Sequence, residues 1–406
     1  MKKIIVLGGG PAGMMAAESA AGQGAAVALI EQNRILGKKL LITGKGRCNI
    51  TNFCSETDLI GQVVTNPKFL YSAFSAFSAY DAYAFFEDLG VPLKVERGNR
   101  VFPLSDRASD VRDALKRRLI DAGVQIIEDQ ITKIGAGPFL LEGKNGRYTC
   151  DRLILATGGL SYPLTGSTGD GLRFAASLGH SVIKPEPALV PLLEQGNLCG
   201  TLAGLTLKNV QLTMFGCKAN ELYKGFGEML FTHQGISGPL VLSASSFMKA
   251  DQFPATAEID LKPALTADRL DQRLIRDFTL FANRDFHHAL ERLLPRKLIP
   301  VIVAQSGIAP DLKTHQVTRE QRLKLVYIMK HFRVKLLKKS GFSEAIITSG
   351  GVDVAQVRPQ TMESRLVPGL FFAGEILDVD ALTGGYNLQT AYATGRLAGR
   401  SAARED

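Results

Sequence analysis

The sequence predicts an α/β fold in which a domain with a parallel sheet is interrupted by two inserts. Short apolar runs that end at glycine alternate with helical patterns near both ends of the chain, which is typical of units built of strand, helix and strand. Residues 205–212 alternate between apolar and polar side chains, as half-buried strands do. Residues 318–321 have the form of a capping box, and apolar residues follow at helical spacing. We therefore expect a β-rich insert followed by a helical one.

The first thirty residues predict a strand, a glycine-rich turn, a helix and a second strand. Residues 3–7 are a short apolar run, and residues 14–23 are rich in alanine, a strong helix former. Residues 26–30 form the second apolar run. Runs of this length, bounded by glycine, fit strands that are buried on both faces.

The same pattern returns later in the chain. Residues 109–122 carry apolar side chains at four-residue spacing and lead through a glycine to residues 124–128, which predicts another helix and strand. Residues 152–156 and 370–373 are further short apolar runs that lead into glycines. Both are typical of buried strands.

The composition is that of a folded protein with more than one domain. At about 150 residues per domain, 406 residues predict two to three domains, and 45% hydrophobic with 21% charged residues excludes a disordered chain. No apolar window is long enough for a membrane helix or a signal peptide, so we expect a soluble cytoplasmic protein without a membrane partner. The five cysteines are odd in number and lack metal-site spacing, so we expect neither a disulfide framework nor a metal.

The net charge of +9 comes from one part of the chain. Residues 266–340 contain 16 Lys or Arg and 7 Asp or Glu, and the other residues contain 32 of each. We interpret this surplus first as the solvated face of a helical insert. The alternative is a surface for nucleic acid or an acidic partner, and we expect no nucleic acid because the segment lacks interleaved aromatics and Arg-Gly repeats.

Residues 8–13 fit the pattern GxGxxG between a strand and a helix, which predicts a dinucleotide site. Gly8 suits the tight turn, Gly10 lets the backbone approach a pyrophosphate, and Gly13 lets the helix pack closely on the strand. Glu31 ends the second strand, 18 residues beyond Gly13, close to the ~20 residues expected of a carboxylate that binds a ribose hydroxyl.

A second nucleotide-contact region near the C-terminus favours FAD over NAD. Residues 369–375 are a strand ending in Gly-Glu, and a glycine pair and a helix start follow in residues 384–389. This arrangement resembles the second flavin motif of the glutathione-reductase-like FAD fold. There, Glu375 would meet ribityl hydroxyls, and amides near Asn387 and Leu388 would polarise the flavin's pyrimidine carbonyl.

Four further segments carry a closer resemblance: TGKGRCNITN at residues 43–52, GSTGDG at 166–171, FTHQGISGP at 231–239 and TMES at 361–364. Together they resemble the BaiN-like family of NAD(P)/FAD-dependent oxidoreductases over essentially the whole chain. Members of this family resemble both enoyl-type reductases of 3-oxo bile acids and an aminoacetone oxidase. The resemblance therefore indicates the cofactor more narrowly than the substrate.

The resemblance also implies a discontinuous Rossmann-like FAD-binding domain with a β-barrel-like insert and a helical insert. We place the FAD domain at residues 1–195 and 341–406, the β-rich insert at 196–264 and the basic helical insert at 265–340.

The residues expected to contact FAD lie in or beside these motifs. They are Gly8, Gly10, Pro11, Ala12, Gly13, Glu31, Gln32, Lys38, Thr43, Gly44, Arg47, Cys48, Asn49, Ile131, Thr157, Gly158, Gly374, Glu375, Tyr386, Asn387 and Leu388. Arg47 is expected to meet a flavin carbonyl or an acidic group of the substrate.

His233 is the first candidate proton donor, because reduction of an activated C=C needs a proton as well as a hydride. It lies in a Gly-rich loop of the β-rich insert. Tyr386 and Asp378 flank the second flavin motif and are the other catalytic candidates. Cys48 and Cys54 have five residues between them, unlike the four of the redox disulfide in glutathione reductase relatives, so we expect no catalytic dithiol.

These observations predict an FAD-dependent oxidoreductase that transfers a hydride through flavin N5 to or from a small organic substrate. The leading interpretation is NAD(P)H-linked reduction of a C=C in a 3-oxo steroid-like enone. The chain has no second GxGxxG after a strand, so NADH or NADPH would bind transiently. One alternative is an oxidase of a small amine or aminoketone that uses oxygen, and another is a flavoprotein that binds or modifies nucleic acid. The oligomeric state stays open.

Overall fold

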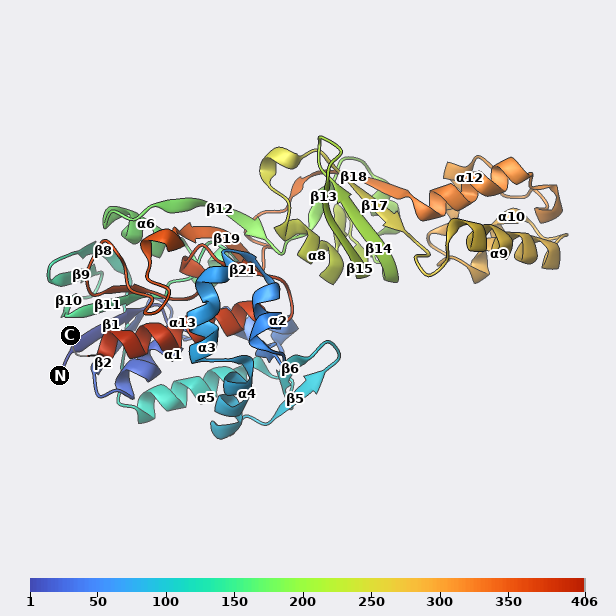
Figure 1. Cartoon of the computed structure of the whole chain (residues 1–406). Coiled ribbons are helices and arrows are strands. Elements are labelled where there is room, and N and C mark those ends of the chain that lie inside the picture. Colours follow the sequence, from blue (N-terminus) through green and yellow to red (C-terminus); the bar gives the residue numbers. More distant parts are fainter. Residues whose placement is uncertain (405–406) are drawn as a thin grey trace. The chain divides into compact units, whose positions relative to one another are not determined.

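The computed structural model describes residues 1–404 and consists of two compact units (Figure 1). The first unit comprises Met1–Ala188 together with the segment that starts at Gly341, and the second is Leu189–Ser340. Each unit has a hydrophobic core of its own.

A five-stranded parallel sheet forms the centre of the first unit, in the order β20-β11-β1-β2-β7. Its strands are β1 (Lys3–Leu7), β2 (Ala26–Glu31), β7 (Gln125–Glu128), β11 (Arg152–Leu155) and β20 (Leu370–Phe372). The predicted apolar runs coincide with these strands to within a residue or two, and the predicted α/β fold is confirmed.

Two helices pack closely beside this sheet, α1 (Pro11–Ala21) and α13 (Tyr386–Ala403). A Cβ added at Gly395 would lie 2.2 Å from the carbonyl oxygen of Ala12, and one at Gly399 would lie 2.1 Å from that of Ala16. Only glycine permits so close an approach. The first and last helices of the chain are thereby held together, as Figure 1 shows.

The remaining elements of the first unit form smaller layers around the sheet. They are β3 (Thr51–Asn52), α2 (Glu56–Gly61), β4 (Val63–Thr65), α3 (Tyr71–Ala76), α4 (Ala79–Asp88), β5 (Leu93–Glu96), β6 (Arg100–Pro103), α5 (Ala108–Asp121), β8 (Ile131–Gly135), β9 (Phe139–Gly143), β10 (Arg147–Cys150), α6 (Asp170–Ser177), β12 (Val182–Ala188), β19 (Ile347–Val352) and β21 (Asp380–Ala381). The pairings are β10-β9-β8, β12-β19, β21-β4 and β3-β6-β5.

The second unit contains a closed six-stranded barrel in the order β13-β16-β15-β14-β17-β18. Its strands are β13 (Leu192–Glu194), β14 (Thr206–Phe215), β15 (Glu221–Phe231), β16 (Gly235–Ser237), β17 (Ala255–Asp260) and β18 (Phe332–Lys339). Two strands lie outside the β-rich insert placed at residues 196–264. Strand β13 lies in residues that we assigned to the FAD domain, and β18 lies in residues that we assigned to the helical insert. Both belong to the barrel because β13 pairs with β16 and β18, and β18 pairs with β17.

The helices of the second unit are α7 (Leu198–Leu202), α8 (Pro239–Ser246), α9 (Ala267–Leu280), α10 (Phe286–Ala289), α11 (Ile299–Ser306) and α12 (Arg319–Lys330). The predicted capping box starts α12: Thr318 Oγ1 accepts from the amide of Gln321 at 3.2 Å, and Gln321 Oε1 accepts from the amide of Thr318 at 2.9 Å. Barrel strands and helices share one hydrophobic core.

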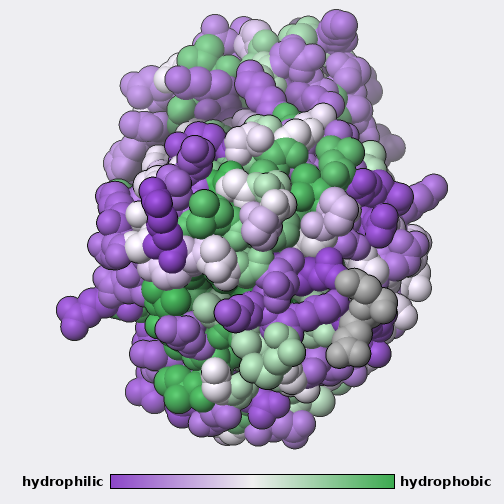
Figure 2. All heavy atoms as spheres, turned by 90° about the vertical axis from the view of Figure 1, so that its left-hand side faces the viewer, coloured by the Kyte–Doolittle hydropathy of each residue, from purple (hydrophilic) through white to green (hydrophobic). Residues whose placement is uncertain are grey.

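On the side shown in Figure 2, hydrophobic residues lie exposed among more numerous hydrophilic ones, as on most folded domains. Within the described residues, no helix is both long enough and apolar enough to cross a membrane.

Candidate functional site

The glycine-rich loop between β1 and α1 has one open position. Gly8 has a φ of +109°, and an added Cβ there would lie 2.5 Å from the carbonyl oxygen of Ala156. A Cβ at Gly13 would lie 1.8 Å from the carbonyl oxygen of Gly8. By contrast, a Cβ at Gly10 would meet no atom within 4 Å. The first and last glycines are therefore needed for packing, whereas Gly10 faces the free space that a pyrophosphate requires.

Helix α1 presents free amides to that space. Its first intrahelical hydrogen bond runs from the amide of Met14 to the carbonyl of Gly10, at 2.9 Å. The amides of Ala12 and Gly13 have no helical acceptor, and Pro11 at the first position has no N–H to lose. Such a helix start binds anions through its amides and its positive dipole end.

Glu31 lies beside the loop at the end of β2. Its Oε2 accepts from the amide of Gly9 at 2.7 Å, and its Oε1 accepts from the backbone amide and the side-chain Nδ2 of Asn33, at 2.8 and 2.7 Å. A carboxylate has about four acceptor positions, so Glu31 can brace the loop and still accept from a ribose hydroxyl. Gln32 and Lys38 instead donate to the carbonyls of Gly166 and Leu164, at 2.7 and 2.8 Å.

The second flavin motif touches the first. Gly374, at the end of β20, has a φ of +76°, and an added Cβ would lie 2.6 Å from the Cβ of Ala12. The amide of Gly374 donates to Thr394 Oγ1 in α13 at 3.0 Å. Two segments more than 350 residues apart in the sequence thus meet at the start of α1.

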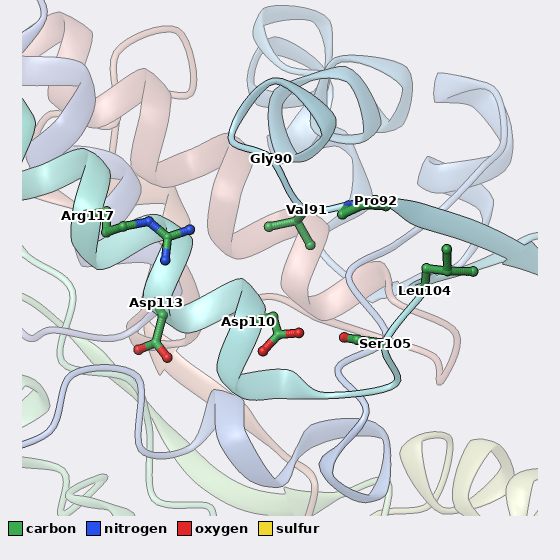
Figure 3. A pocket seen from close by; sticks show the side chains of 8 residues that line it. All are labelled: Gly90, Val91, Pro92, Leu104, Ser105, Asp110, Asp113 and Arg117. Atoms are coloured by element: carbon green, nitrogen blue, oxygen red, sulfur yellow. The ribbon is translucent and has the colours of Figure 1, made fainter.

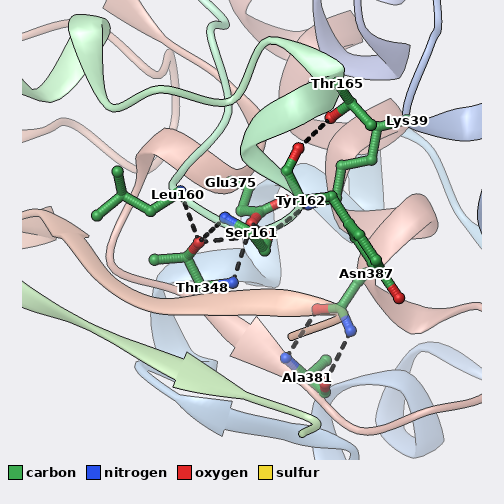
Figure 4. Close-up of polar contacts among 9 residues, drawn as sticks. All are labelled: Lys39, Leu160, Ser161, Tyr162, Thr165, Thr348, Glu375, Ala381 and Asn387. Atoms are coloured by element: carbon green, nitrogen blue, oxygen red, sulfur yellow. Dashed lines mark hydrogen bonds and ion pairs between the residues drawn. The ribbon is translucent and has the colours of Figure 1, made fainter. Parts of the chain in front are cut away.

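Glu375 is the centre of a polar network that the sequence did not indicate (Figure 4). Its Oε2 accepts from Lys39 Nζ at 2.5 Å, and its Oε1 accepts from Ser161 Oγ at 2.5 Å and from the amide of Thr348 at 2.9 Å. Lys39 also donates to Ser161 Oγ at 2.5 Å. The carboxylate therefore joins four chain segments, and this bracing accompanies the ribityl contact expected of Glu375. No local pattern marks Lys39, Ser161 or Thr348 as its partners.

Helix α13 offers a second set of free amides. Its first hydrogen bond runs from the amide of Gln389 to the carbonyl of Gly385 at 3.0 Å, which leaves the amides of Tyr386, Asn387 and Leu388 without helical acceptors. The Asn387 side chain accepts from the amide of Ala381 at 2.9 Å and donates to its carbonyl at 2.8 Å (Figure 4). The side chain holds the turn before the helix while the amides remain free.

The TGKGRCNITN segment docks onto the start of α13. Thr51 Oγ1 donates to Gln389 Oε1 at 2.7 Å, and Asn52 Nδ2 donates to the carbonyl of Gly384 at 3.2 Å. Thr51, Asn52 and Gln389 belong to the quoted motifs but were not among the candidates. Their side chains join the segment of residues 43–52 to the second motif of residues 384–389. We call these two segments, the loop of residues 8–13 and the adjoining Glu31, Thr157, Gly158, Gly374 and Glu375 the cradle.

Arg47 and Cys48 occupy the middle of that segment. The Arg47 guanidinium contacts the carboxylates of Glu96 and Asp106 and lies over the Phe102 ring, 4.1 Å from its centroid. To contact a flavin carbonyl, Arg47 would have to give up its contact with one of these two carboxylates. Cys48 is fully buried, and burial raises the pKa of its thiol to about 12.

Two buried side-chain atoms in the cradle have no hydrogen-bond partner among the described residues, Oδ1 of Asn49 and Oγ1 of Thr157. Unsatisfied polar atoms in a folded core point to a missing partner. Together with the space at Gly10, they fit a polar cofactor such as FAD.

Four other candidates have local roles in the protein. Thr43 Oγ1 donates to the carbonyl of Leu40 at 2.7 Å, and Gly44 and Gly158 take the positive φ values of +56° and +74°. Ile131 lies in the hydrophobic core of the first unit.

The three catalytic candidates have different surroundings. Tyr386 is half-buried, and burial raises the pKa of its hydroxyl to about 12. Burial also raises the pKa of Asp378, although Asn66 Nδ2 donates to its Oδ2 at 3.0 Å. Both belong to the first unit. His233 is exposed in the turn between β15 and β16 of the second unit, so its position relative to the cradle stays a prediction.

The free cysteines include Cys48 and Cys54, both buried. Burial, with the nearby charge of Asp58, raises the pKa of Cys54 to about 11. Such thiols carry little thiolate at neutral pH, and thiolate is the reactive form.

A pocket of about 460 Å³ lies between the turn after α4, the end of β6 and α5 (Figure 3). Its lining includes Asp110, Asp113 and Arg117, and none of the candidate cofactor or catalytic residues. It is separate from the cradle.

Comparison with known proteins agrees with this geometry. The family model described as HI0933-like protein Rossmann domain matches residues 2–401. A 3-dehydro-bile acid delta(4,6)-reductase of Clostridium scindens is 32% identical over 99% of both chains. A ribosomal RNA dihydrouridine synthase of Haemophilus influenzae is 30% identical over 99% of this chain and 98% of its own, and its namesake in Escherichia coli is also 30% identical.

Solved structures show the fold. A 3-ketosteroid delta1-dehydrogenase from Sterolibacterium denitrificans has a TM-score of 0.50 at 12% identity and covers 99% of this chain and 100% of its own. The expected resemblance is confirmed by the full-length matches: the chain belongs to the HI0933-like family of Rossmann-domain proteins and is an FAD-dependent oxidoreductase.

Proposed function

We propose that this protein reduces a C=C bond conjugated to a carbonyl group. The observation that carries the proposal is that its relatives' names describe one reaction on two substrates. A delta(4,6)-reductase of a 3-dehydro steroid saturates double bonds conjugated to a ketone. Dihydrouridine arises when the C5=C6 bond of uracil, conjugated to the C4 carbonyl, is saturated. Both reactions add a hydride at one carbon and a proton at its neighbour.

The cradle residues would bind and orient FAD for this reaction. The amides of Ala12 and Gly13 would hold the pyrophosphate in the space at Gly10, and Glu31 would accept from a ribose hydroxyl. The amides that start α13 would polarise a flavin carbonyl. Bound FAD would supply the hydride through N5, after reduction by transiently bound NADH or NADPH.

We assign the proton first to His233. Its imidazole is exposed in the turn between β15 and β16, and an exposed imidazole is free to donate a proton to a ligand. Tyr386 and Asp378 are the other candidates. The raised pKa values of both groups keep more of each protonated at a given pH than in an ordinary side chain, so each could hold a proton to give.

The expected substrate is a small ring enone, such as a 3-oxo-4-ene steroid. A uracil ring within RNA is a second candidate, and the observation that favours it is the charge surplus in residues 266–340. A neutral steroid offers no negative charge to a positively charged surface, whereas RNA carries a negative charge at each phosphate. Both substrates require the same hydride transfer.

The proposal is tested by anaerobic reduction of the bound flavin with NADH or NADPH, followed by mixing with one acceptor at a time. The acceptors are a 3-oxo-4-ene steroid, free uridine, a uridine-rich RNA and oxygen. Reoxidation by the steroid or by RNA, with formation of the saturated ring, is the expected result. Rapid reoxidation by oxygen alone would contradict it and indicate an oxidase.

A further inference from the structure

The positive surplus of the second unit is unevenly paired with carboxylates. Arg273 contacts Asp277 at 2.6 Å, and Arg322 contacts Asp271 at 2.6 Å. Lys330 lies 2.5 Å from Asp260. These cations stabilise the contacts of α9 and α12 and have little capacity for a partner.

Three arginines near α10 differ from these cations. Arg284, Arg292 and Arg296 are exposed, and none of them forms an ion pair with a carboxylate within the described part of the chain. Arg284 and Arg292 share one aromatic ring, that of Phe281, with guanidinium carbons 4.8 and 5.6 Å from its centroid. We call Phe281, Arg284, Arg292 and Arg296 the Phe281 cluster.

Arg296 follows Arg292 by four positions in the stretch 291–297, in which every residue except Leu293 and Leu294 is exposed. The pKa of Glu291 is lowered, first by its hydrogen bond with His288 and further by the charges of His288 and Arg296. Glu291 is thus already hydrogen-bonded to His288 and does not pair with the arginines. The Phe281 cluster therefore keeps a net positive charge.

The neighbouring groups favour an anion over a metal cation. Asp285, His287 and His288 offer ligand atoms within 4.8 Å of one another. However, Lys313 Nζ already lies 2.7 Å from Asp285 Oδ1, and Arg284 adjoins Asp285 in the sequence. A dication would have to displace the lysine and enter a positive field, whereas an anion would be attracted by both.

We propose that the Phe281 cluster binds the phosphodiester backbone of RNA. The planar guanidinium group donates two parallel hydrogen bonds to a phosphate, a geometry that an ammonium group cannot provide. Phe281 keeps the guanidinium groups of Arg284 and Arg292 together, so that both can bind neighbouring phosphates of one strand. The inference rests on the second candidate substrate of the proposed function, a uracil ring within RNA.

The test measures binding of a fluorescein-labelled stem–loop RNA with a uridine-rich loop to the FAD-bound protein, by anisotropy at several KCl concentrations. The variant is R284Q/R292Q/R296Q. The matched control is K116Q/R117Q/K133Q, which removes the same charge from exposed positions of the first unit. For a single strand, each phosphate contact adds about 0.7 to the magnitude of the slope of log K against log[salt]. Loss of three contacts should therefore lower this slope by about two and weaken binding about a hundredfold near 0.1 M salt. The control should stay within about threefold, because none of its three residues belongs to the Phe281 cluster.

R284K/R292K/R296K keeps the charge and serves as the folding check, since it should bind RNA more tightly than the glutamine variant. Absence of RNA binding by the unaltered protein would overturn the inference, as would equal losses in variant and control. Competition by polyglutamate as effective as that by RNA would indicate an acidic protein partner instead. Reoxidation of the reduced flavin by a steroid enone or free uridine, measured on the same preparations, should be unchanged in R284Q/R292Q/R296Q. Its failure in the unaltered protein would refute the small-substrate reaction and leave the binding result standing.

Discussion

Replacing Gly10 by valine should remove FAD and leave the protein folded. Gly10 has φ −77° and ψ −178°, extended backbone that valine adopts readily, and its added Cβ would meet no atom within 4 Å. The folded chain therefore accepts the side chain. The branched methyl groups would occupy the space beside the amides of Ala12 and Gly13, where the pyrophosphate is expected.

The size of the effect follows from those two amides. Each would donate a hydrogen bond to a charged phosphate, worth about 1.5 to 3 kcal/mol. Loss of both weakens FAD binding by about 3 to 6 kcal/mol, or roughly 10² to 10⁴-fold in Kd.

The assay is titration of the apoprotein with FAD, followed by flavin fluorescence, together with the Tm of the apoprotein. Gly61→Val is the matched control, because a Cβ at Gly61 also meets no atom within 4 Å and Gly61 lies outside the cradle at the end of α2. The control should bind FAD as the unaltered protein does. A Gly10→Val protein with unchanged FAD affinity would refute the placement of the pyrophosphate, and FMN in place of FAD would refute the cofactor assignment.

Three further outcomes are expected. His233→Ala should lower flavin reoxidation by the substrate about 10² to 10⁴-fold with FAD content and Tm unchanged, because the side chain is exposed; an unaltered rate would assign the proton to another group. Serine at both Cys48 and Cys54 should leave turnover within about tenfold, or ~1.4 kcal/mol in the barrier, since the high thiol pKa values leave almost no thiolate; a loss of several orders of magnitude with FAD bound would indicate thiol chemistry. Burial raises the pKa of Asp378, so the folded protein holds this proton more tightly than the unfolded chain and loses stability as pH rises above ~3.9. Asp378→Asn should therefore raise Tm relative to the unaltered protein by more at pH 7 than at pH 4, and a pH-independent difference would contradict this.

The sequence determined the local units of the fold. The strand, glycine loop and helix of residues 3–21 and the capping box at Thr318 depend on contacts between residues a few positions apart, which a pattern can reveal. The distinct roles of Gly8, Gly10 and Gly13 could be anticipated for the same reason, because the loop geometry is imposed by its own backbone.

The barrel boundaries needed the tertiary structure. In β18, buried Phe332, Val334 and Leu336 alternate with exposed residues, a strand pattern that its basic side chains and its position after α12 concealed. In β13 only three residues pair, too few for any periodicity. Membership of both strands is set by the partners that close the barrel.

The sequence by itself indicated which motifs are expected to bind FAD, and the tertiary structure alone decided how these motifs are joined. Glu375 meets Lys39 and Ser161 across 336 and 214 positions, and Thr51 meets Gln389 across 338. Lysine, serine, threonine and glutamine occur throughout the chain, and nothing local distinguishes the ones that will become partners. A partly buried carboxylate is satisfied by whichever donors the fold brings within about 3 Å. These contacts therefore exist only once the distant segments have packed together.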